Sequence, residues 1–308
     1  MQIYLPIAEM PVDVLFVLGM SAIVGFISGM FGIGGGFLMT PLLIFIGIPP
    51  AIAVASQTAQ IVASSTTSSI TAFHRQSIDF KLGSVLVAGG FIGSILGIFM
   101  FAAARRAGQL DLVIVVSYVL LFLIVGSLML RESIKDLWFK YSGRPRQLST
   151  ASHHASYLGW PLRMRFPRSK LYCSVIPVVG LAFFIGFIGA LLGVGGGFIL
   201  VPALLYLFRV PTSVVVGTSQ FQIVCTSLVA LILHALTNQA VDIILALLLI
   251  IGGVFGAQIG ARIAKHLKAE MFRLLLALLL LAVGIQFAFD LFVPPKEPFS
   301  ISASERLP

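Results

Sequence analysis

Long runs of apolar residues, separated by short polar stretches, fill most of the chain. Between Val14 and Phe73, sixty residues pass without an Asp, Glu, Lys or Arg. A helix needs about 20 apolar residues to cross the hydrocarbon core of a bilayer, so this run alone predicts more than one crossing. Ten apolar segments can be drawn, five on each side of a basic stretch. They are 12–32, 36–48, 51–73, 82–104 and 112–130, then 171–192, 197–208, 213–236, 241–261 and 271–292.

The second segment of each half is short and follows a cluster of glycines. At 1.5 Å per residue, these segments give helices of about 20 Å, less than the roughly 30 Å thickness of the core. GIGGG precedes one of them at 32–36, and GVGGG precedes the other at 193–197. Because glycine costs about 1 kcal/mol relative to alanine inside a helix, each cluster predicts a break between two helices.

The two halves match residue by residue, which indicates an internal repeat. GFISGMFGIGGGFLMTPLL matches GFIGALLGVGGGFILVPAL at an offset of 161 residues, and VASQTAQIV matches VGTSQFQIV at an offset of 162. Asp79 pairs with Asp242 in the same way, and helix N-capping accounts for both. Five crossings per half would make the repeats inverted, whereas short segments that dip in and return would make them parallel. The charge pattern favours the inverted arrangement, so we expect an all-α integral membrane protein of two inverted-topology repeats, with glycine-broken helices at the midplane.

Composition and charge support this class and exclude others. The chain is 58% hydrophobic and 10% charged, against about 25% charged residues in soluble domains. Residues 131–170 hold nine Lys or Arg against Glu132 and Asp136, so much of the net charge of +9 lies in one loop. The positive-inside rule places such a loop in the cytoplasm, and this location explains the positive charge without a nucleic-acid partner. The two cysteines have no metal-ligand spacing, and we expect no metal and no cofactor. The predicted organisation is a first membrane repeat (1–130), a basic linker (131–170), a second repeat (171–293) and a polar tail (294–308), with both termini outside.

The paired glycine breaks predict an anion site. Each is followed by a short helix, beginning at Phe37 or Phe198, whose first N–H groups lack partners within the helix. These donors and the positive end of the helix dipole favour an anion, and glycine lets the backbone approach it closely. The alternative is that the glycines only allow close helix packing. The candidate ligands are Gly34, Gly35, Gly36, Gly195, Gly196 and Gly197.

A polar stripe on the third segment of each half extends this site. Residues spaced by four share one face of a helix, and uncharged amides and hydroxyls can coordinate an anion. Interhelical hydrogen bonding is the alternative role. The stripe residues are Ser56, Gln60 and Ser64, matched by Thr218, Gln222 and Thr226, with Gln57, Thr58, Ser219 and Gln220 beside them. His74 and His234 are candidates for proton coupling, although histidines near segment ends more often anchor a helix at the membrane interface.

The chain resembles the sulfite exporter TauE/SafE family of bacterial membrane transporters. The resemblance rests on GMFGIGGGFLMTPLL, GALLGVGGGFILVPALL, PTSVVVGTSQFQIV and WPLRMRFPRSKLYCSVIP. It implies a location in the bacterial inner membrane and transport of sulfur-containing anions such as sulfite, sulfonates or thiosulfate, commonly outward.

We therefore expect a secondary transporter, and not an enzyme, that exports a small sulfur-containing anion by alternating access of the two repeats. Export of one negative charge from a negative-inside cell releases about 2.3 kcal/mol per 100 mV, so the membrane potential alone can drive it. The alternatives are a passive anion channel and an intramembrane hydrolase that pairs a serine with His74 or His234. The identity of the anion, the coupling ion and the oligomeric state stay open.

Overall fold

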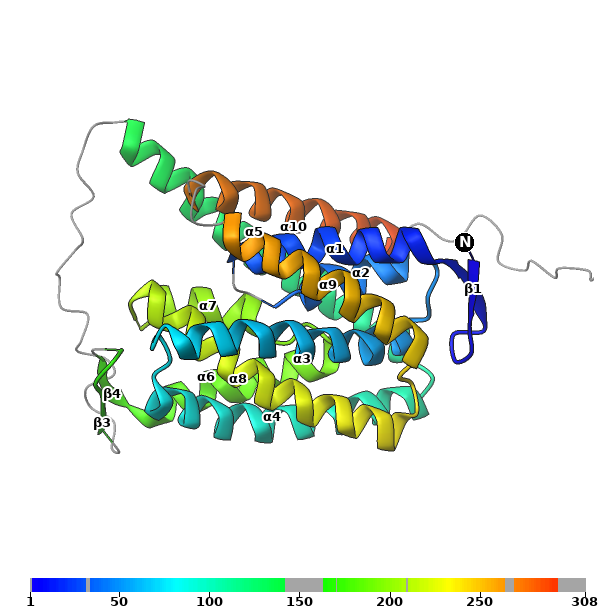
Figure 1. The fold of residues 1–308 in the computed structure, drawn as a ribbon, viewed down its shortest axis with the longest axis horizontal. Coiled ribbons are helices and arrows are strands. Elements are labelled where there is room, and N and C mark those ends of the chain that lie inside the picture. The colour runs from blue at the N-terminus through cyan, green and yellow to red at the C-terminus, as the bar shows by residue number, and fades with distance from the viewer. Residues whose placement is uncertain are drawn as a thin grey trace, which may run out of the picture.

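The two halves of the chain fold into the same series of elements. The computed structural model describes residues 2–31, 34–141, 163–169, 171–208, 210–263 and 269–292. In each half, a two-stranded hairpin precedes one helix, one short helix and three further helices (Figure 1). The first half comprises β1 (Gln2–Leu5), β2 (Met10–Asp13), α1 (Val14–Phe31), α2 (Gly36–Phe45), α3 (Pro50–His74), α4 (Phe80–Arg106) and α5 (Leu110–Tyr141). The second half comprises β3 (Arg163–Phe166), β4 (Leu171–Ser174), α6 (Val175–Leu192), α7 (Gly197–Tyr206), α8 (Thr212–Leu233), the π-helical turn η2 (His234–Asn238), α9 (Ile243–Ile263) and α10 (Ala269–Phe292).

The all-α character predicted from the apolar segments is confirmed. Each of the ten segments forms a helix within the described ranges, and both glycine-led segments form short helices of 10 residues. Among the described residues, five helices (α4, α5, α6, α9, and α8 together with η2) are long and apolar enough to cross a membrane. Helix α3 has 25 residues, but its many Ser, Thr and Gln side chains lower its hydropathy. Polar residues are therefore concentrated on a helix of spanning length.

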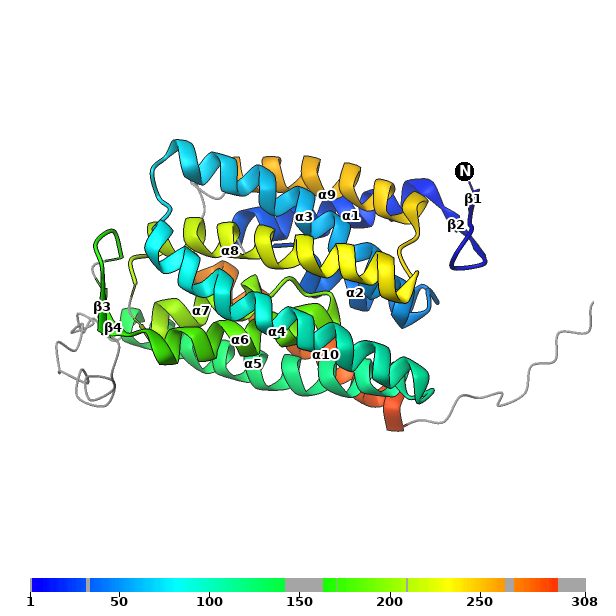
Figure 2. The ribbon, with the colours of Figure 1, turned by 90° about the horizontal axis from the view of Figure 1, so that it is seen from below.

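The two β-hairpins are not predicted by the apolar pattern. They are antiparallel and lie at opposite ends of the bundle (Figures 1 and 2). Each hairpin leads into a helix through a capping side chain, because Asp13 accepts a hydrogen bond from the Leu15 N–H and Ser174 accepts one from the Ile176 N–H. Helix α5 reaches Tyr141 and β3 begins at Arg163, so both ends of the expected 131–170 linker are folded. The middle of that linker and the 294–308 tail lie outside the described residues.

Helices from different halves pack together. Helix α1 lies along α9, and α4 lies along α6. Helix α3 packs against α9, whereas α8 packs against α4. We call the first group, with hairpin β1–β2, the α1–α9 unit, and the second group, with hairpin β3–β4, the α4–α6 unit. The two units meet where α3 contacts α8, while α5 and α10 pack against each other in a further layer (Figure 2).

Glycines bring the backbones into direct contact within each unit. A Cβ atom on Gly25 of α1 would lie 2.3 Å from the carbonyl oxygen of Gly253 of α9. A Cβ atom on Gly186 of α6 would lie 2.3 Å from the carbonyl oxygen of Gly90 of α4. Such distances are far inside van der Waals contact, so any side chain at either position would separate the helices. Small residues commonly permit this approach between helices in membranes.

Asp79 and Asp242 cap helices α4 and α9, as predicted, and also hold the hairpins. One carboxylate oxygen of each accepts two N–H groups from the first turn of its own helix. The second oxygen of Asp79 accepts the N–H and hydroxyl of Ser169, in the β3–β4 turn, at 2.9 and 2.7 Å. The second oxygen of Asp242 accepts the N–H of Ile7, in the β1–β2 turn, at 2.9 Å. Each aspartate thus joins one hairpin to its own unit.

The glycine contacts predict a position-specific cost for adding one methyl group. We expect Gly186→Ala to lower the thermal unfolding midpoint in detergent, because its Cβ would overlap the backbone of Gly90. Gly180→Ala in the same helix is the matched control, since no atom lies within 4 Å of its Cβ position. This control should be neutral or stabilising, because alanine favours helix by about 1 kcal/mol. Equal midpoints for the two variants would contradict the contact.

The hydrogen bonds of Asp79 predict a second stability effect. We expect Asp79→Ala to destabilise the protein by at least about 2 kcal/mol, through loss of the helix cap and of the acceptor for the buried Ser169 donors. Thermal unfolding in detergent measures the change, with Asp111→Ala, at an exposed position in the first turn of α5, as control. A midpoint for Asp79→Ala equal to that of the control would show that the carboxylate contributes nothing to holding the hairpin.

Candidate functional site

Both glycine clusters lie in breaks between helices. Helix α1 ends at Phe31 and α2 begins at Gly36, while α6 ends at Leu192 and α7 begins at Gly197. Gly34 has a φ of 79°, and Gly195 and Gly196 have φ values of 74° and 75°. This left-handed region is readily available to glycine alone, so a side chain there would strain the turn. Gly32 and Ile33, also within the first cluster, lie outside the described residues.

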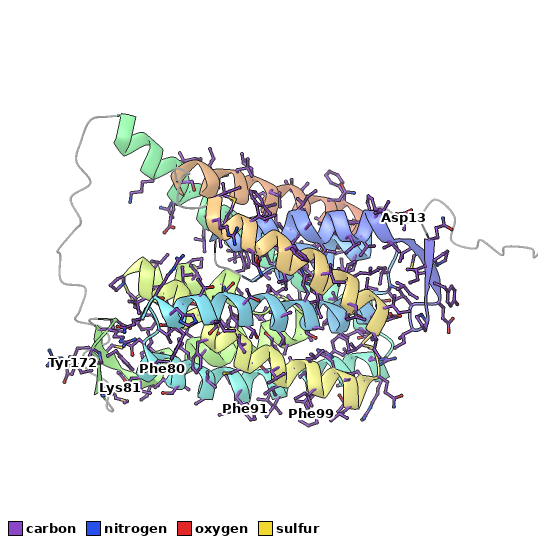
Figure 3. All side chains as sticks on the ribbon, in the orientation of Figure 1. Asp13, Phe80, Lys81, Phe91, Phe99 and Tyr172 are labelled. Atoms are coloured by element: carbon purple, nitrogen blue, oxygen red, sulfur yellow. The ribbon has the colours of Figure 1, made fainter. Side chains whose placement is uncertain are left out.

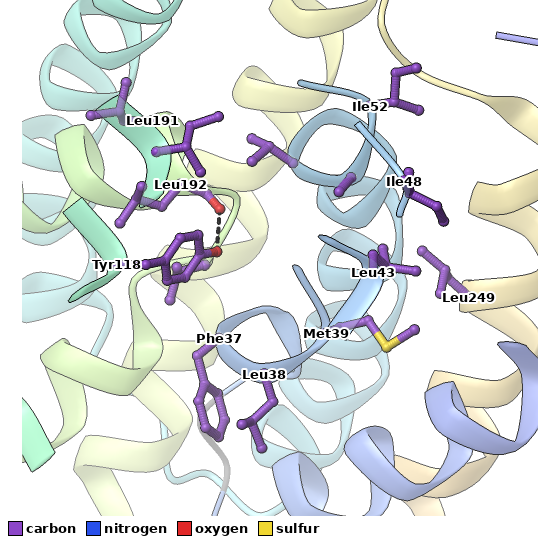
Figure 4. Packing of buried hydrophobic residues seen from close by; sticks show 14 of the residues in the cluster. Phe37, Leu38, Met39, Leu43, Ile48, Ile52, Tyr118, Leu191, Leu192 and Leu249 are labelled. Carbon is purple, nitrogen blue, oxygen red and sulfur yellow. Dashed lines mark hydrogen bonds between the residues drawn. The ribbon is translucent and has the colours of Figure 1, made fainter. Parts of the chain in front are cut away.

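The two breaks lie against each other. A Cβ on Gly36 would lie 2.6 Å from the carbonyl oxygen of Gly193, so the start of α2 directly contacts the loop of the other half. The rings of Phe37 and Phe198, the second residues of α2 and α7, stack with centroids 5.1 Å apart. Tyr118 of α5 donates a 2.6 Å hydrogen bond to the carbonyl of Leu192, at the end of α6 (Figure 4). The structure thus brings the N-terminal ends of both short helices together.

Gln57 and Gln60 of α3 and Gln222 of α8 are buried, and most of their amide atoms have no hydrogen-bond partner among the described residues. Gln57 and Gln60 are fully buried, and neither amide of the two forms a hydrogen bond with a described residue. The Gln222 Nε2 group donates to the Thr226 hydroxyl at 3.3 Å, but its Oε1 atom accepts nothing within the described chain. An unpaired buried polar group costs about 1–3 kcal/mol, so a ligand or water that satisfied these amides would bind favourably.

The glutamine side chains lie beside glycines of neighbouring helices. The Gln60 amide nitrogen is 3.5 Å from the Cβ position of Gly35, at the first break, and 2.0 Å from that of Gly253 in α9. The Gln222 amide nitrogen is 2.7 Å from the Cβ position of Gly90 in α4. A Cβ on Gly90 or Gly253 would therefore displace the amide. These glycines make room for the glutamines as well as for the helix contacts.

The other predicted stripe residues do not all face one site. The Ser56 hydroxyl accepts the Asp242 N–H at 2.9 Å, and the Thr218 hydroxyl accepts the Asp79 N–H at 3.0 Å, so both hold helix starts. The Ser64 hydroxyl donates to a carbonyl of its own helix, at Ile61. Ser219 is fully buried, and its hydroxyl has no partner among the described residues; Gln220 is 1% exposed.

A small cavity at the second glycine break is enclosed mainly by α6 and α8, with α3 and α4 completing its wall. It has a volume of about 10 Å³, which is room for about one water molecule. Gly195, Gln222 and Thr226, all predicted site residues, line it. A sulfur oxyanion, with three or four oxygens, needs more room, so the observed conformation is closed around this position.

Thr58 of α3, predicted beside the stripe, also lines this cavity. Two further polar residues of the lining were not predicted: Ser94 of α4 and Ser227 of α8. Ser227 matches Ser65 at the repeat offset of 162, and both hydroxyls are buried without a partner in the described part of the chain. The repeat match was the sequence signal that could have singled out this pair. Ser65 lies within SSTTSS, however, and six adjacent hydroxyl residues give no reason to select one of them.

The two candidate histidines lie outside the cavity. His74 is exposed at the end of α3, with its ring edge against Phe73. His234 is fully buried; its Nε2 atom lies 3.1 Å from the Ala190 carbonyl and its Nδ1 atom 3.1 Å from the Asn238 amide. Both ring nitrogens of His234 are therefore engaged, and neither contact is the serine hydroxyl that the hydrolase alternative requires.

Comparison with known proteins identifies the family. The profile of the family described as "Sulfite exporter TauE/SafE" matches residues 17–287. A probable membrane transporter protein of Bacillus subtilis, YunE, is 26% identical over 285 residues, covering 90% of this chain and 97% of its own length. A probable membrane transporter protein of Xylella fastidiosa is 29% identical, covering 89% and 94%. No solved structure matches the chain.

A plant relative shares part of the chain. Sulfite exporter TauE/SafE family protein 5 of Arabidopsis thaliana is 30% identical over 122 residues, which is 40% of this chain and 27% of the plant protein. The two bacterial relatives named above, by contrast, align over nearly their whole length. Both are named membrane transporters, and the described residues include five helices long and apolar enough to span a bilayer. The chain is a multi-pass membrane transporter, and it belongs to the sulfite exporter TauE/SafE family.

Proposed function

We propose that this transporter exports a small sulfur-containing anion, with sulfite as the first candidate substrate, by alternating access around the paired glycine breaks. The family name and the duplicated breaks support this substrate class. The observation that carries the proposal is the pair of buried amides on α3, Gln57 and Gln60, which have no hydrogen-bond partner among the described residues. Gln57, Gln60 and Gln222 offer neutral N–H donors, which bind an oxyanion without holding it as tightly as a lysine or arginine would.

The substrate position lies between the two structural units. Gln57 and Gln60 belong to α3 of the α1–α9 unit, whereas Gln222 and Thr226 belong to α8 of the α4–α6 unit. A cavity of about 10 Å³ cannot admit the anion, so transport requires α3 and α8 to separate. We propose that the moving bodies are the two mixed units, and not the two halves of the sequence. Glycine contacts and the aspartate-held hairpins keep each unit rigid during this motion.

The placement of the hairpins supports inverted-topology repeats in the membrane. Hairpin β3–β4, which directly follows the basic linker, lies at one end of the bundle, and hairpin β1–β2 lies at the other (Figures 1 and 2). Equivalent elements on opposite sides are what an inverted repeat produces. The positive-inside rule then places the β3–β4 end in the cytoplasm and the N-terminal hairpin outside. With this orientation, a negative-inside potential favours anion movement toward the β1–β2 end.

A flux measurement tests the substrate and the site together. In proteoliposomes, we expect saturable electrogenic flux of one anion among sulfite, sulfate, thiosulfate, sulfoacetate and chloride. The double variant Gln60→Met/Gln222→Met keeps side-chain volume but removes the amides. It should reduce flux at least tenfold, because each hydrogen bond to a charged ligand contributes about 1.5–3 kcal/mol. Its thermal stability should be unchanged or higher, because unpaired buried polar atoms are removed.

Gln109→Met, at an exposed loop position, is the control and should keep full flux. Flux that does not saturate and shows no counter-flow would indicate a passive channel. Absence of flux for every anion under an imposed potential would contradict the anion site and leave the glycines with a packing role. Full flux in the double variant would place the substrate elsewhere.

Labelling of single cysteines tests the inverted topology. In a background with Cys173→Ser and Cys225→Ser, we expect Glu9→Cys and Pro167→Cys to react from opposite sides of the membrane, because these exposed residues lie in the turns of the two hairpins. An impermeant maleimide added to intact cells should label Glu9→Cys but not Pro167→Cys. Labelling of both from the same side would favour parallel repeats.

A further inference from the structure

A second, larger cavity lies apart from the proposed transport site. It has a volume of about 290 Å³ and is formed by the last turns of α4 with the end of α8 and the π-helical turn η2. Helix α4 starts beside hairpin β3–β4 at Phe80 and runs toward the opposite end of the bundle, past Phe99 (Figure 3). The cavity is therefore at the end far from the basic linker.

The lining of this cavity is amphipathic. Its wall is apolar, with Ile95, Ile98 and Leu233, whereas its other part carries Arg105 and Arg106. No carboxylate is present among its described lining residues. Two guanidinium groups beside an apolar wall match a ligand that carries a negative head on a hydrocarbon chain.

The two arginines have different environments. Arg105 donates to the carbonyl of Asn238, the last residue of η2, and so fixes the π-helical turn against α4. Arg106 forms no such bond to the described backbone and is exposed beside the cavity. A π-helical turn frequently marks a functional site. Arg105 is therefore a positioning residue here, and Arg106 is the group available to a ligand.

The cavity opens toward the lipid-facing surface of the bundle. Phe99, part of its lining, is 65% exposed and points away from the bundle, on the same edge as Phe91 (Figure 3). Helix α4 has 27 residues, which gives a length of about 40 Å, longer than the roughly 30 Å hydrocarbon core. The arginines in its last turn accordingly lie at the level of the lipid headgroups, with the apolar wall at the level of the acyl chains.

The charge distribution makes these arginines unusual. The positive-inside rule accounts for the basic linker at the β3–β4 end but not for two arginines at the opposite end. We infer that the cavity is a binding site for an anionic phospholipid of the surrounding bilayer. The Arg106 guanidinium binds the phosphate, Arg105 holds the π-helical turn that shapes the site, and an acyl chain runs along Ile95, Ile98 and Phe99. This site is independent of the proposed transport function.

Native mass spectrometry of the detergent-purified protein tests this site. We expect short-chain phosphatidylglycerol to bind more tightly than phosphatidylcholine of the same chain length. Arg106→Gln should weaken phosphatidylglycerol binding about fivefold, the contribution of one basic residue near a membrane surface. Ala102→Trp, which fills the cavity while retaining both arginines, should weaken it similarly, because Ala102 lies in the lining.

Arg75→Gln, at an exposed position after α3, is the matched control and should bind like the wild type. Equal affinity for the two lipids, or unchanged binding in Arg106→Gln, would overturn the site. Glycerol phosphate binding as tightly as the intact lipid would also overturn it, because the apolar wall would then contribute nothing and the site would serve a water-soluble anion.

Discussion

Direct backbone contact between helices of opposite halves is the constraint on which the remaining structure depends. A bilayer gives no hydrophobic force between apolar helices, so their association relies on close packing. Gly25 with Gly253 and Gly186 with Gly90 provide that packing, each with room for a hydrogen atom and nothing larger. Because each contact joins one helix from each half, the halves interleave into two mixed units. Helices α3 and α8 are then left facing each other between the units, which is where the polar residues gather.

Buried polar side chains at the interface between the units have fewer hydrogen-bond partners than those inside each unit. Within each unit, both carboxylate oxygens of Asp79 and of Asp242 accept hydrogen bonds from backbone or hydroxyl donors. By contrast, Gln57 and Gln60, on the helix α3 that meets α8, have no hydrogen-bond partner among the described residues. The units are thus held by satisfied polar networks, whereas their boundary carries unsatisfied ones. A boundary of that kind opens at lower cost than either unit unfolds, because separation lets water or an anion reach the amides.

Much of this arrangement can be predicted from the sequence, because it depends on local rules. The glycine clusters predict the breaks, and the matched Asp79 and Asp242 predict the caps. The hairpins could not be predicted, because strands of four residues, such as MPVD and RMRF, are too short to show a clear alternation of apolar and polar side chains. The packing of helices from opposite halves into mixed units could not be predicted either, because the order of helices along a chain does not say which of them pack together. Ser56 and Thr218 show the same limit: helical spacing places them on the stripe, but only the tertiary fold brings the N–H groups of Asp242 and Asp79 to their hydroxyls.

Comparing the two halves distinguishes residues that build the shared fold from residues that occur in one half alone. Matched residues, such as the glycine pairs and the two aspartates, repeat the same contact in both units. Unmatched residues do not: Gln57 corresponds to Ser219, and His234 with its π-helical turn corresponds to Ala72 in an uninterrupted helix. Contacts that occur twice cannot distinguish the two faces of a membrane, whereas contacts that occur once can. For the proposed anion export, the direction of transport would therefore come from the membrane potential acting on the anion, together with these few asymmetric positions.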